Sequence, residues 1–166
     1  MATLELTPDV TFMPPPRGGP RPKTPPVLPY IQLDQWPPAE IVRDLIQSSL
    51  SLENVRSQQS RMAAPQSVAL YLPDRYAEGP DDAFIDGHEF CHLHPPPHGS
   101  LHLTLPNPLR EYAIRLGWAE QHPVARAGIM PETLVLVFAP RDRQELAVVQ
   151  YLVWSSFRYA RGGGGS

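Results

Sequence analysis

The chain has 166 residues, of which 42% are hydrophobic and 19% charged, enough apolar material for one domain with a buried core. Its formal net charge of −3 argues against partners that recruit strongly basic proteins, so we expect it to bind neither nucleic acid nor a membrane surface. A single cysteine, Cys91, excludes an internal disulfide and removes any need for an oxidising compartment.

The chain also lacks the apolar segments that direct a protein to a membrane. No run reaches the roughly 18 consecutive apolar residues of a membrane-spanning helix. The N-terminal sequence MATLELTPDV is acidic and has no basic-then-apolar secretory pattern. We therefore expect a soluble, cytoplasmic protein.

The two ends of the chain differ in composition from its middle. Eleven of the 22 prolines fall within the first 38 residues, where fixed φ angles and missing donors favour an extended segment. We expect a flexible, proline-rich N-terminus over residues 1–24, disordered before Pro14, then a single domain over residues 25–161 that begins with an extended arm. Residues 162–166, GGGGS, are typical of an engineered linker or a tag remnant. Apolar residues are expected to hold the arm against the domain: Val27, Leu28, Tyr30, Ile31, Leu33 and Trp36.

Helix and strand patterns follow one another along the domain. Apolar residues at helical spacing predict a helix from Pro37-Pro38 to Leu50, and strands are predicted over residues 52–58, 67–72, 89–94 and 100–105. A second helix is predicted from Asn107, as its N-cap, to Gly117. The continuously apolar residues 133–138 predict a central strand, and Asp142 is expected to cap a last helix over residues 143–159. This order predicts an α+β fold in which an antiparallel sheet packs against two or three helices.

Histidine is concentrated in one short stretch of the chain. Five of the six histidines lie between His88 and His102, where a uniform distribution would place fewer than one. Histidine titrates near neutral pH and is a common metal ligand, so such a cluster points to proton chemistry or to a metal.

The strand pattern predicts which of these histidines face one another. The loop Pro95-Pro96-Pro97-His98-Gly99 separates the two strands, and a five-residue hairpin loop would place His92 opposite His102 and His94 opposite Ser100. Side chains two residues apart on a strand share a face, so Ser100, His102 and Thr104 would line the same side of the sheet. The opposite side is expected to be apolar and to carry Leu93, Leu101, Leu103 and Leu105.

Three interpretations of this face remain open at the level of residue spacing. One imidazole acts as a general base in a partly dry pocket. Alternatively, His92, His94 and His102 bind a metal such as zinc or iron, with Glu89 or His122 as a fourth ligand. The third interpretation is a polar face that meets solvent, and it suits His88 and His98 best.

Two neighbouring features have simpler explanations. Cys91 alternates with Phe90 and Leu93 in a predicted strand, so a buried structural thiol is favoured over a nucleophile. In the segment from Gly117 to His122, a helix end with a packed Trp118 explains the first two residues, whereas His122 has no structural explanation.

Four motifs in the second half of the chain resemble the fungal luciferase family. Their order and spacing match, and weaker collinear similarity extends the resemblance to about residues 20–160. The motifs are Glu89-x-x-His92-x-His94, Ser100-Leu101-His102-Leu103, Gly117-Trp118-x-x-x-His122-Pro123-Val124-Ala125 and Phe138-Ala139-Pro140-Arg141-Asp142.

The resemblance implies oxidation of a hydroxylated α-pyrone, 3-hydroxyhispidin in the fungi, with O2 as co-substrate. An endoperoxide-like intermediate would lose CO2 and leave an open-chain acid in a light-emitting state, with no organic cofactor and no metal expected. In such a mechanism one histidine removes the enol proton, and donor groups hold the resulting anion. The resemblance also implies the substrate-binding residues Ser100, Thr104, Trp118 and Arg141, although Arg141 has the simpler alternative of pairing with Asp142.

The expected catalytic roles divide as follows. His92 and His102 would be the base and its partner, His94 a substrate anchor and His122 a second proton carrier, with Glu89 orienting an imidazole.

The fungal enzymes carry an N-terminal membrane segment that this chain lacks, which again implies a soluble protein. The competing functions are a metal-dependent oxygenase or hydrolase that uses the same histidines, and a protein that binds a phenolic or pyrone small molecule without catalysis.

Overall fold

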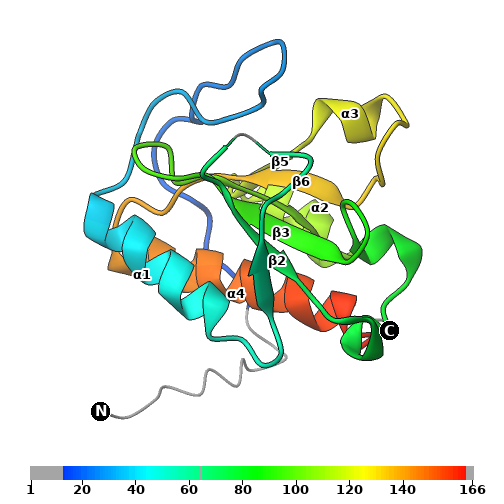
Figure 1. The fold of residues 1–166 in the computed structure, drawn as a ribbon. Coiled ribbons are helices and arrows are strands. Elements are labelled where there is room, and N and C mark those ends of the chain that lie inside the picture. Colours follow the sequence, from blue (N-terminus) through cyan, green and yellow to red (C-terminus); the bar gives the residue numbers. More distant parts are fainter. Residues whose placement is uncertain (1–12, 64, 164–166) are drawn as a thin grey trace.

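The predicted α+β fold is confirmed by a computed structural model, which describes residues 13–63 and 65–163. Six antiparallel strands form one sheet in the order β1-β2-β3-β4-β6-β5, with helices packed around it (Figure 1). Two 3-10 turns, at Asp74–Tyr76 and Asp81–Ala83, lie in the long connection before β3. The elements in chain order are α1 (Ala39–Leu50), β1 (Arg56–Gln58), β2 (Val68–Tyr71), β3 (Glu89–Leu93), β4 (Leu101–Thr104), α2 (Leu109–Arg115), β5 (Ala119–Gln121), α3 (Pro123–Arg126), β6 (Leu134–Val137) and α4 (Arg143–Ala160).

The main hydrophobic core lies between one face of the sheet and the helices α1 and α4 (Figure 1). α4 presents Val149, Leu152 and Val153 to this core, and all three are buried. The sheet supplies the apolar face predicted from strand alternation: Leu93, Leu101, Leu103 and Leu105, together with the fully buried Cys91. His92 and His102, which alternate with these aliphatic residues on β3 and β4, point to the other side of the sheet.

The local sequence explains where α4 begins and why β6 lies inside the sheet. Asp142 precedes α4 in an extended conformation, and its Oδ1 accepts a hydrogen bond of 2.9 Å from the backbone N–H of Glu145, as expected of an N-cap. β6 is buried along its whole length and pairs with β4 on one side and β5 on the other. The predicted cap and the predicted central strand are both confirmed.

The region around α2 differs from the prediction. Asn107 does not cap the helix, because its Oδ1 accepts a hydrogen bond of 3.1 Å from Nε of Arg110 and no capping bond to the backbone forms. Gly117 ends this region as predicted, at a φ of +86° that favours glycine. The short edge strand β5 and the single turn of α3 were not predicted, since neither is long enough to show a period.

The N-terminal segment, residues 13–38, has no helix or strand and runs along the domain. Its contacts begin before residue 25, because the backbone N–H of Arg17 donates to the carbonyl of Leu116 at 2.9 Å. Gln32 holds the segment further along, because its fully buried Oε1 accepts a hydrogen bond of 2.7 Å from the backbone of Ala139. The disorder expected before Pro14 concerns residues that, apart from Met13, lie outside the described part of the chain.

The side chains expected to anchor this segment were mostly predicted wrongly. Tyr30 is buried, whereas Val27, Leu28, Leu33 and Trp36 are between 44% and 68% exposed. The physical reason is that a segment without regular structure must satisfy its own polar groups. The buried amide of Gln32 and the backbone bonds therefore fix it more than its apolar side chains do. Among the described residues, no helix combines the length and the apolar character needed to cross a bilayer.

Candidate functional site

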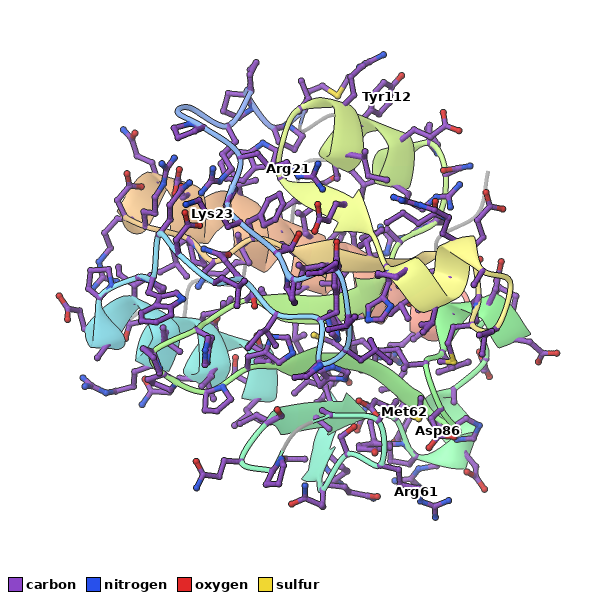
Figure 2. The ribbon with its side chains drawn as sticks, turned by 90° about the horizontal axis from the view of Figure 1, so that it is seen from above. Arg21, Lys23, Arg61, Met62, Asp86 and Tyr112 are labelled. Atoms are coloured by element: carbon purple, nitrogen blue, oxygen red, sulfur yellow. The ribbon has the colours of Figure 1, made fainter. Side chains whose placement is uncertain are left out.

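A cavity of about 350 Å³ opens on the face of the sheet opposite α1 and α4, and four histidines line it. His92 comes from β3, His102 from β4, His94 from the residue after β3, and His122 from the residue that caps α3. We call this space the histidine cavity. Its volume lies in the usual range for small-molecule sites. Figure 2 labels one lining residue, Met62, which lies in the connection between β1 and β2. The remaining walls are mainly apolar and consist of Leu28, Pro29, Tyr30, Ile31, Met62, Ala63, Ile85, Val124, Met130 and Leu134.

The predicted hairpin register is confirmed and explains how the rings meet. His92 pairs directly with His102 across β3 and β4, and the backbone N–H of His94 donates to the carbonyl of Ser100 at 2.9 Å. The ring centroids of His92 and His102 lie 4.8 Å apart, those of His94 and His102 4.7 Å, and those of His102 and His122 4.6 Å. All four side chains are at most 7% exposed, so an interpretation as a solvent-facing polar surface does not fit them.

Glu89 lies at one end of a chain of buried hydrogen bonds through two of these rings. Its Oε1 is 2.7 Å from Nδ1 of His92, and the carboxylate also accepts hydrogen bonds from the hydroxyls of Ser60 and Tyr71. Nε2 of His92 is 2.8 Å from Nδ1 of His102. Nε2 of His102 completes the chain at 2.7 Å from the backbone carbonyl of Tyr30.

The donors and acceptors of this chain determine how many protons it holds. The Tyr30 carbonyl can only accept, so Nε2 of His102 carries a proton. The contact between the two rings needs another proton, because two nitrogen lone pairs facing each other at 2.8 Å would repel. A further proton lies between Nδ1 of His92 and the Glu89 carboxyl group, because two lone pairs facing each other at 2.7 Å would likewise repel. The contact between His92 and His102 thus requires a proton between the two ring nitrogens.

Burial keeps three of the four imidazoles neutral. It lowers the pKa of His102 well below its ordinary value of 6.5, and the neighbouring rings of His92, His94 and His122 lower it further. Burial, followed by the effect of His92, His98 and His122, lowers the pKa of His94 to about 3. The pKa of His122 falls to about 4, through burial and then through His92. These rings therefore act as neutral donors or acceptors near neutral pH.

Only two of the four rings keep a nitrogen that no described residue bonds. Both nitrogens of His92 and of His102 are occupied by the buried chain. His94 is held through Nδ1, 2.8 Å from the hydroxyl of Ser100, and His122 accepts a hydrogen bond through Nδ1 from the backbone N–H of Val124 at 3.2 Å. Nε2 of His94 and Nε2 of His122 are therefore the nitrogens available to a ligand. A direct base role for His92 or His102, as expected from the sequence, does not fit this geometry.

The expected substrate-binding residues lie outside the lining of the histidine cavity. Ser100 holds His94, and Thr104 bonds the Ala83 carbonyl and approaches Ser156 of α4. Trp118 packs into the core and its Nε1 donates to the Pro15 carbonyl at 2.7 Å.

Arg141 pairs with Glu145, with Nη2 2.6 Å from Oε2, and this ion pair replaces the suggested pairing with Asp142. His88 lies beside Asp74, and His98 packs edge-on against Trp36, so neither belongs to the cavity. Cys91 is a buried thiol in the core as predicted, and burial raises its pKa well above the ordinary value.

The three hairpin histidines also have the arrangement of a metal-binding site. One ligand nitrogen from each of His92, His94 and His102 lies within 4.8 Å of the others. The remaining nitrogen of each ring meets a carboxylate, a hydroxyl or a backbone carbonyl, the partners that usually orient histidines around a metal. Tetrahedral coordination would need the His92 and His102 nitrogens roughly 3.3 Å apart, so the two rings would separate slightly on binding.

Several residues of the site carry no signal in the sequence. Tyr30 was expected only as an anchor of the arm, yet its carbonyl fixes the proton on His102 and its ring lies edge-on to His122. Two hydroxyls reach Glu89 from elsewhere in the chain: Ser60 from the connection between β1 and β2, and Tyr71 from β2. These contacts join segments far apart in the chain, and no local spacing encodes them.

The fold and the site define an α+β domain with a buried, histidine-lined cavity for a small molecule. Residues 87–156, which include all four cavity histidines and all of β3 and β4, match the family model described as Luciferase domain. The chain is 26% identical over 161 residues to proteins named luciferase from Armillaria ostoyae and Armillaria gallica. It is 32% identical over 73 residues to a luciferase from Neonothopanus nambi.

These comparisons confirm the resemblance to the fungal luciferase family. The Armillaria alignments take in 87% of this chain and 60% of the relatives' own length, while the Neonothopanus alignment takes in 43% and 27%. No solved structure matches the chain.

Proposed function

We propose that this chain is a luciferase-like oxygenase that oxidises a hydroxylated α-pyrone of the 3-hydroxyhispidin type in the histidine cavity. The observation that carries the proposal is the convergence of four buried imidazoles on a cavity whose other walls are mainly apolar. An aromatic pyrone suits such walls, and its acidic enol suits a neutral imidazole. The match to the luciferase domain supports the reaction class.

His94 removes the enol proton in the proposed reaction. If its Nδ1–H donates to the Ser100 hydroxyl, Nε2 presents a lone pair to the cavity. His122 has the opposite character, because its Nδ1 accepts from Val124 and the proton of the neutral ring must sit on Nε2. His122 thus donates a hydrogen bond to the enolate oxygen. The low pKa of His94 is offset once the enolate forms beside it, since the new ion pair favours the imidazolium.

The enolate then supplies the electrons for the reaction with O2. Two carbon–oxygen bonds form as O2 is reduced to a bridging peroxide, and the ring is oxidised. Cleavage of the peroxide with loss of CO2 leaves an open-chain acid. The Glu89–His92–His102 chain does not exchange protons with the substrate directly, because its ring nitrogens are already bonded. It holds the two rings in place beside the developing anions.

The direct test is oxygen uptake by the purified chain with 3-hydroxyhispidin. We expect equal consumption of O2 and release of CO2, and no uptake with the same pyrone lacking the 3-hydroxyl, because the proton that His94 removes in the proposed reaction belongs to that hydroxyl. A chain that binds the hydroxypyrone without consuming O2 would be a binding protein, and the proposed reaction would be wrong.

A metal-dependent oxygenase is the second candidate, and one specific observation favours it. A metal ion can replace the proton between His92 and His102, and His94 then provides a third nitrogen. The oxidation would call for iron, whereas zinc would suit a hydrolase. Nε2 of His122 would remain free to contact the substrate.

Elemental analysis separates the two candidates. The metal candidate predicts about one tightly held ion per chain and its loss on His92→Ala, with inactivation by a chelator. The metal-free proposal predicts full activity in a protein that has been stripped with a chelator and shown to contain no transition metal. Inactivation that iron restores would contradict the metal-free proposal.

A further inference from the structure

A second cavity, of about 410 Å³, lies on another part of the molecule and has a different chemistry. The N-terminal segment and β5 form two of its walls, together with the end of α2. Three arginines line it, Arg17, Arg21 and Arg126, and Glu120 is the acidic residue among its lining. We call it the arginine cavity. No lining residue is shared with the histidine cavity.

Arg17 is a buried cation without a carboxylate partner. It is only 9% exposed, and among the described residues it forms no ion pair. Its Nη2 donates to Oε1 of Gln35 at 2.9 Å and its Nη1 to the Pro20 carbonyl at 3.2 Å, both neutral acceptors. Its buried Nε has no hydrogen-bond partner among the described residues. The carboxylates of Glu145 and Asp34 act on this guanidinium only through space, and no described carboxylate bonds it directly.

The other charged groups leave the cavity positive. Arg21 pairs with the buried Glu120, and Figure 2 labels Arg21 on the N-terminal segment beside β5. Glu120 also accepts a hydrogen bond from the hydroxyl of Tyr30, so two groups already bond its carboxylate. Arg126 is exposed and forms no ion pair with any described residue. Three guanidinium groups against one carboxylate give a local excess of positive charge in a chain whose net charge is −3.

The lining of the arginine cavity also has an apolar part, which indicates that an anion bound there would carry an apolar group. Phe138 lines the cavity, and the guanidinium carbon of Arg17 lies 5.6 Å from its ring centre. Ile114 adds a half-exposed aliphatic surface. An arginine backed by an aromatic ring suits a planar anion that forms paired hydrogen bonds and carries an apolar body.

We propose that the arginine cavity binds a small aromatic carboxylate, with Arg17 and Arg126 receiving the carboxylate and the accessible Ile114 contacting the ring. Arg21 stays with Glu120 and closes the side of the cavity next to Tyr30.

Isothermal titration calorimetry of the full chain with benzoate tests the proposal. We expect saturable binding of benzoate and none of benzamide, which has the same shape without the charge. Arg126→Gln should weaken binding at least about tenfold, as should Arg17→Gln, because each removes a charged hydrogen bond. Arg126 is exposed, so its variant is expected to fold even if Arg17→Gln disturbs the N-terminal segment. Arg43→Gln, an exposed arginine of α1 outside the cavity, should bind like the wild type.

Three results would overturn the proposal: equal binding of benzamide and benzoate, unchanged affinity in Arg126→Gln, or inorganic phosphate binding as tightly as benzoate. The last result would indicate a general anion site without a place for a ring. None of these outcomes bears on the proposed oxidation, because no arginine lines the histidine cavity.

Discussion

His94 illustrates at the residue scale how position turns an ordinary side chain into a specific chemical group. Its place after β3 brings the ring beside His102, and the hydroxyl of Ser100 holds one nitrogen. Burial lowers its pKa to about 3, so the ring stays neutral through the range in which a free histidine becomes charged. The folded protein therefore excludes a proton that the unfolded chain would bind.

This exclusion makes the stability of the protein depend on pH. Between pH 6.5 and pH 5, the unfolded chain takes up a proton at His94 and the folded chain does not, so the free energy of unfolding falls as the pH falls. The contribution of His94 approaches about 1.4 kcal/mol per pH unit below pH 6.5. Urea unfolding at a series of pH values should show a shallower decline for His94→Asn than for the wild type. Parallel declines would mean that His94 is protonated in the folded state.

The sequence identified this residue but not its role. Strand alternation and the five-residue loop were sufficient to place His92 opposite His102 and His94 beside Ser100, since both depend on neighbours within one hairpin. The roles assigned to His92 and His102, a base and its partner, stay predictions; the bond between the two rings and the bond to Tyr30 leave neither ring a free nitrogen. The Tyr30 contact spans 72 positions, and no pattern of residue types predicts it.

The β3–β4 hairpin is the element that builds the site, and Gly99 is its tightest point. Gly99 has a φ of +71°, and a Cβ added there would lie 2.7 Å from Cγ of Pro37 and 3.0 Å from Cγ2 of Val42. The loop is thus wedged against the start of α1, immediately before the strand that carries His102. The position of the histidine rings therefore depends on the absence of a side chain at residue 99.

Gly99→Ala should destabilise the protein more than a matched glycine substitution. Gly87 also has a positive φ, +56°, but a Cβ there meets nothing within 4 Å. Both changes cost about 1 kcal/mol for the backbone conformation, and Gly99→Ala adds a clash worth roughly 1–3 kcal/mol. Thermal unfolding of the two variants measures the difference. Equal melting temperatures would show that the loop can move away from α1.

Elements with a long or strongly apolar pattern were predictable, and short ones were not. α4 has a cap and eighteen residues of amphipathic pattern, and β6 is apolar throughout. β5 has three residues, one of them the buried Glu120, which does not look like a strand residue on its own. Glu120 is buried there because Tyr30 and Arg21 reach it from the N-terminal segment.

At the scale of the whole molecule, the N-terminal segment contributes lining residues to both cavities. Tyr30 lines the histidine cavity, and Arg17, Gly19 and Arg21 line the arginine cavity. Gln32 fixes the segment, since its Nε2 donates to the carbonyls of Asp34 and Gln35 and its Oε1 accepts from Ala139. A segment that was expected to be held by apolar side chains is held largely by one buried amide.

Gln32→Ala should therefore loosen the segment without touching a histidine. The backbone N–H of Ala139 loses its acceptor, which costs about 1–3 kcal/mol of unfolding free energy. The carbonyl of Tyr30 then no longer fixes His102, so we also expect a lower kcat for oxygen uptake. Gln47→Ala, an exposed glutamine of α1, is the control for both readouts. A Gln32→Ala protein with wild-type stability and activity would contradict this role for the segment.

The proposed oxidation depends most on His94, which takes the proton from the hydroxypyrone. The rate of oxygen uptake at saturating 3-hydroxyhispidin measures this role most directly. His88→Ala is the matched variant, because His88 lies six residues earlier in the chain and outside the cavity. We predict that His94→Ala lowers the rate at least about 100-fold and that His88→Ala leaves it unchanged. A His94→Ala protein that consumes oxygen within a few-fold of the wild-type rate would contradict the account.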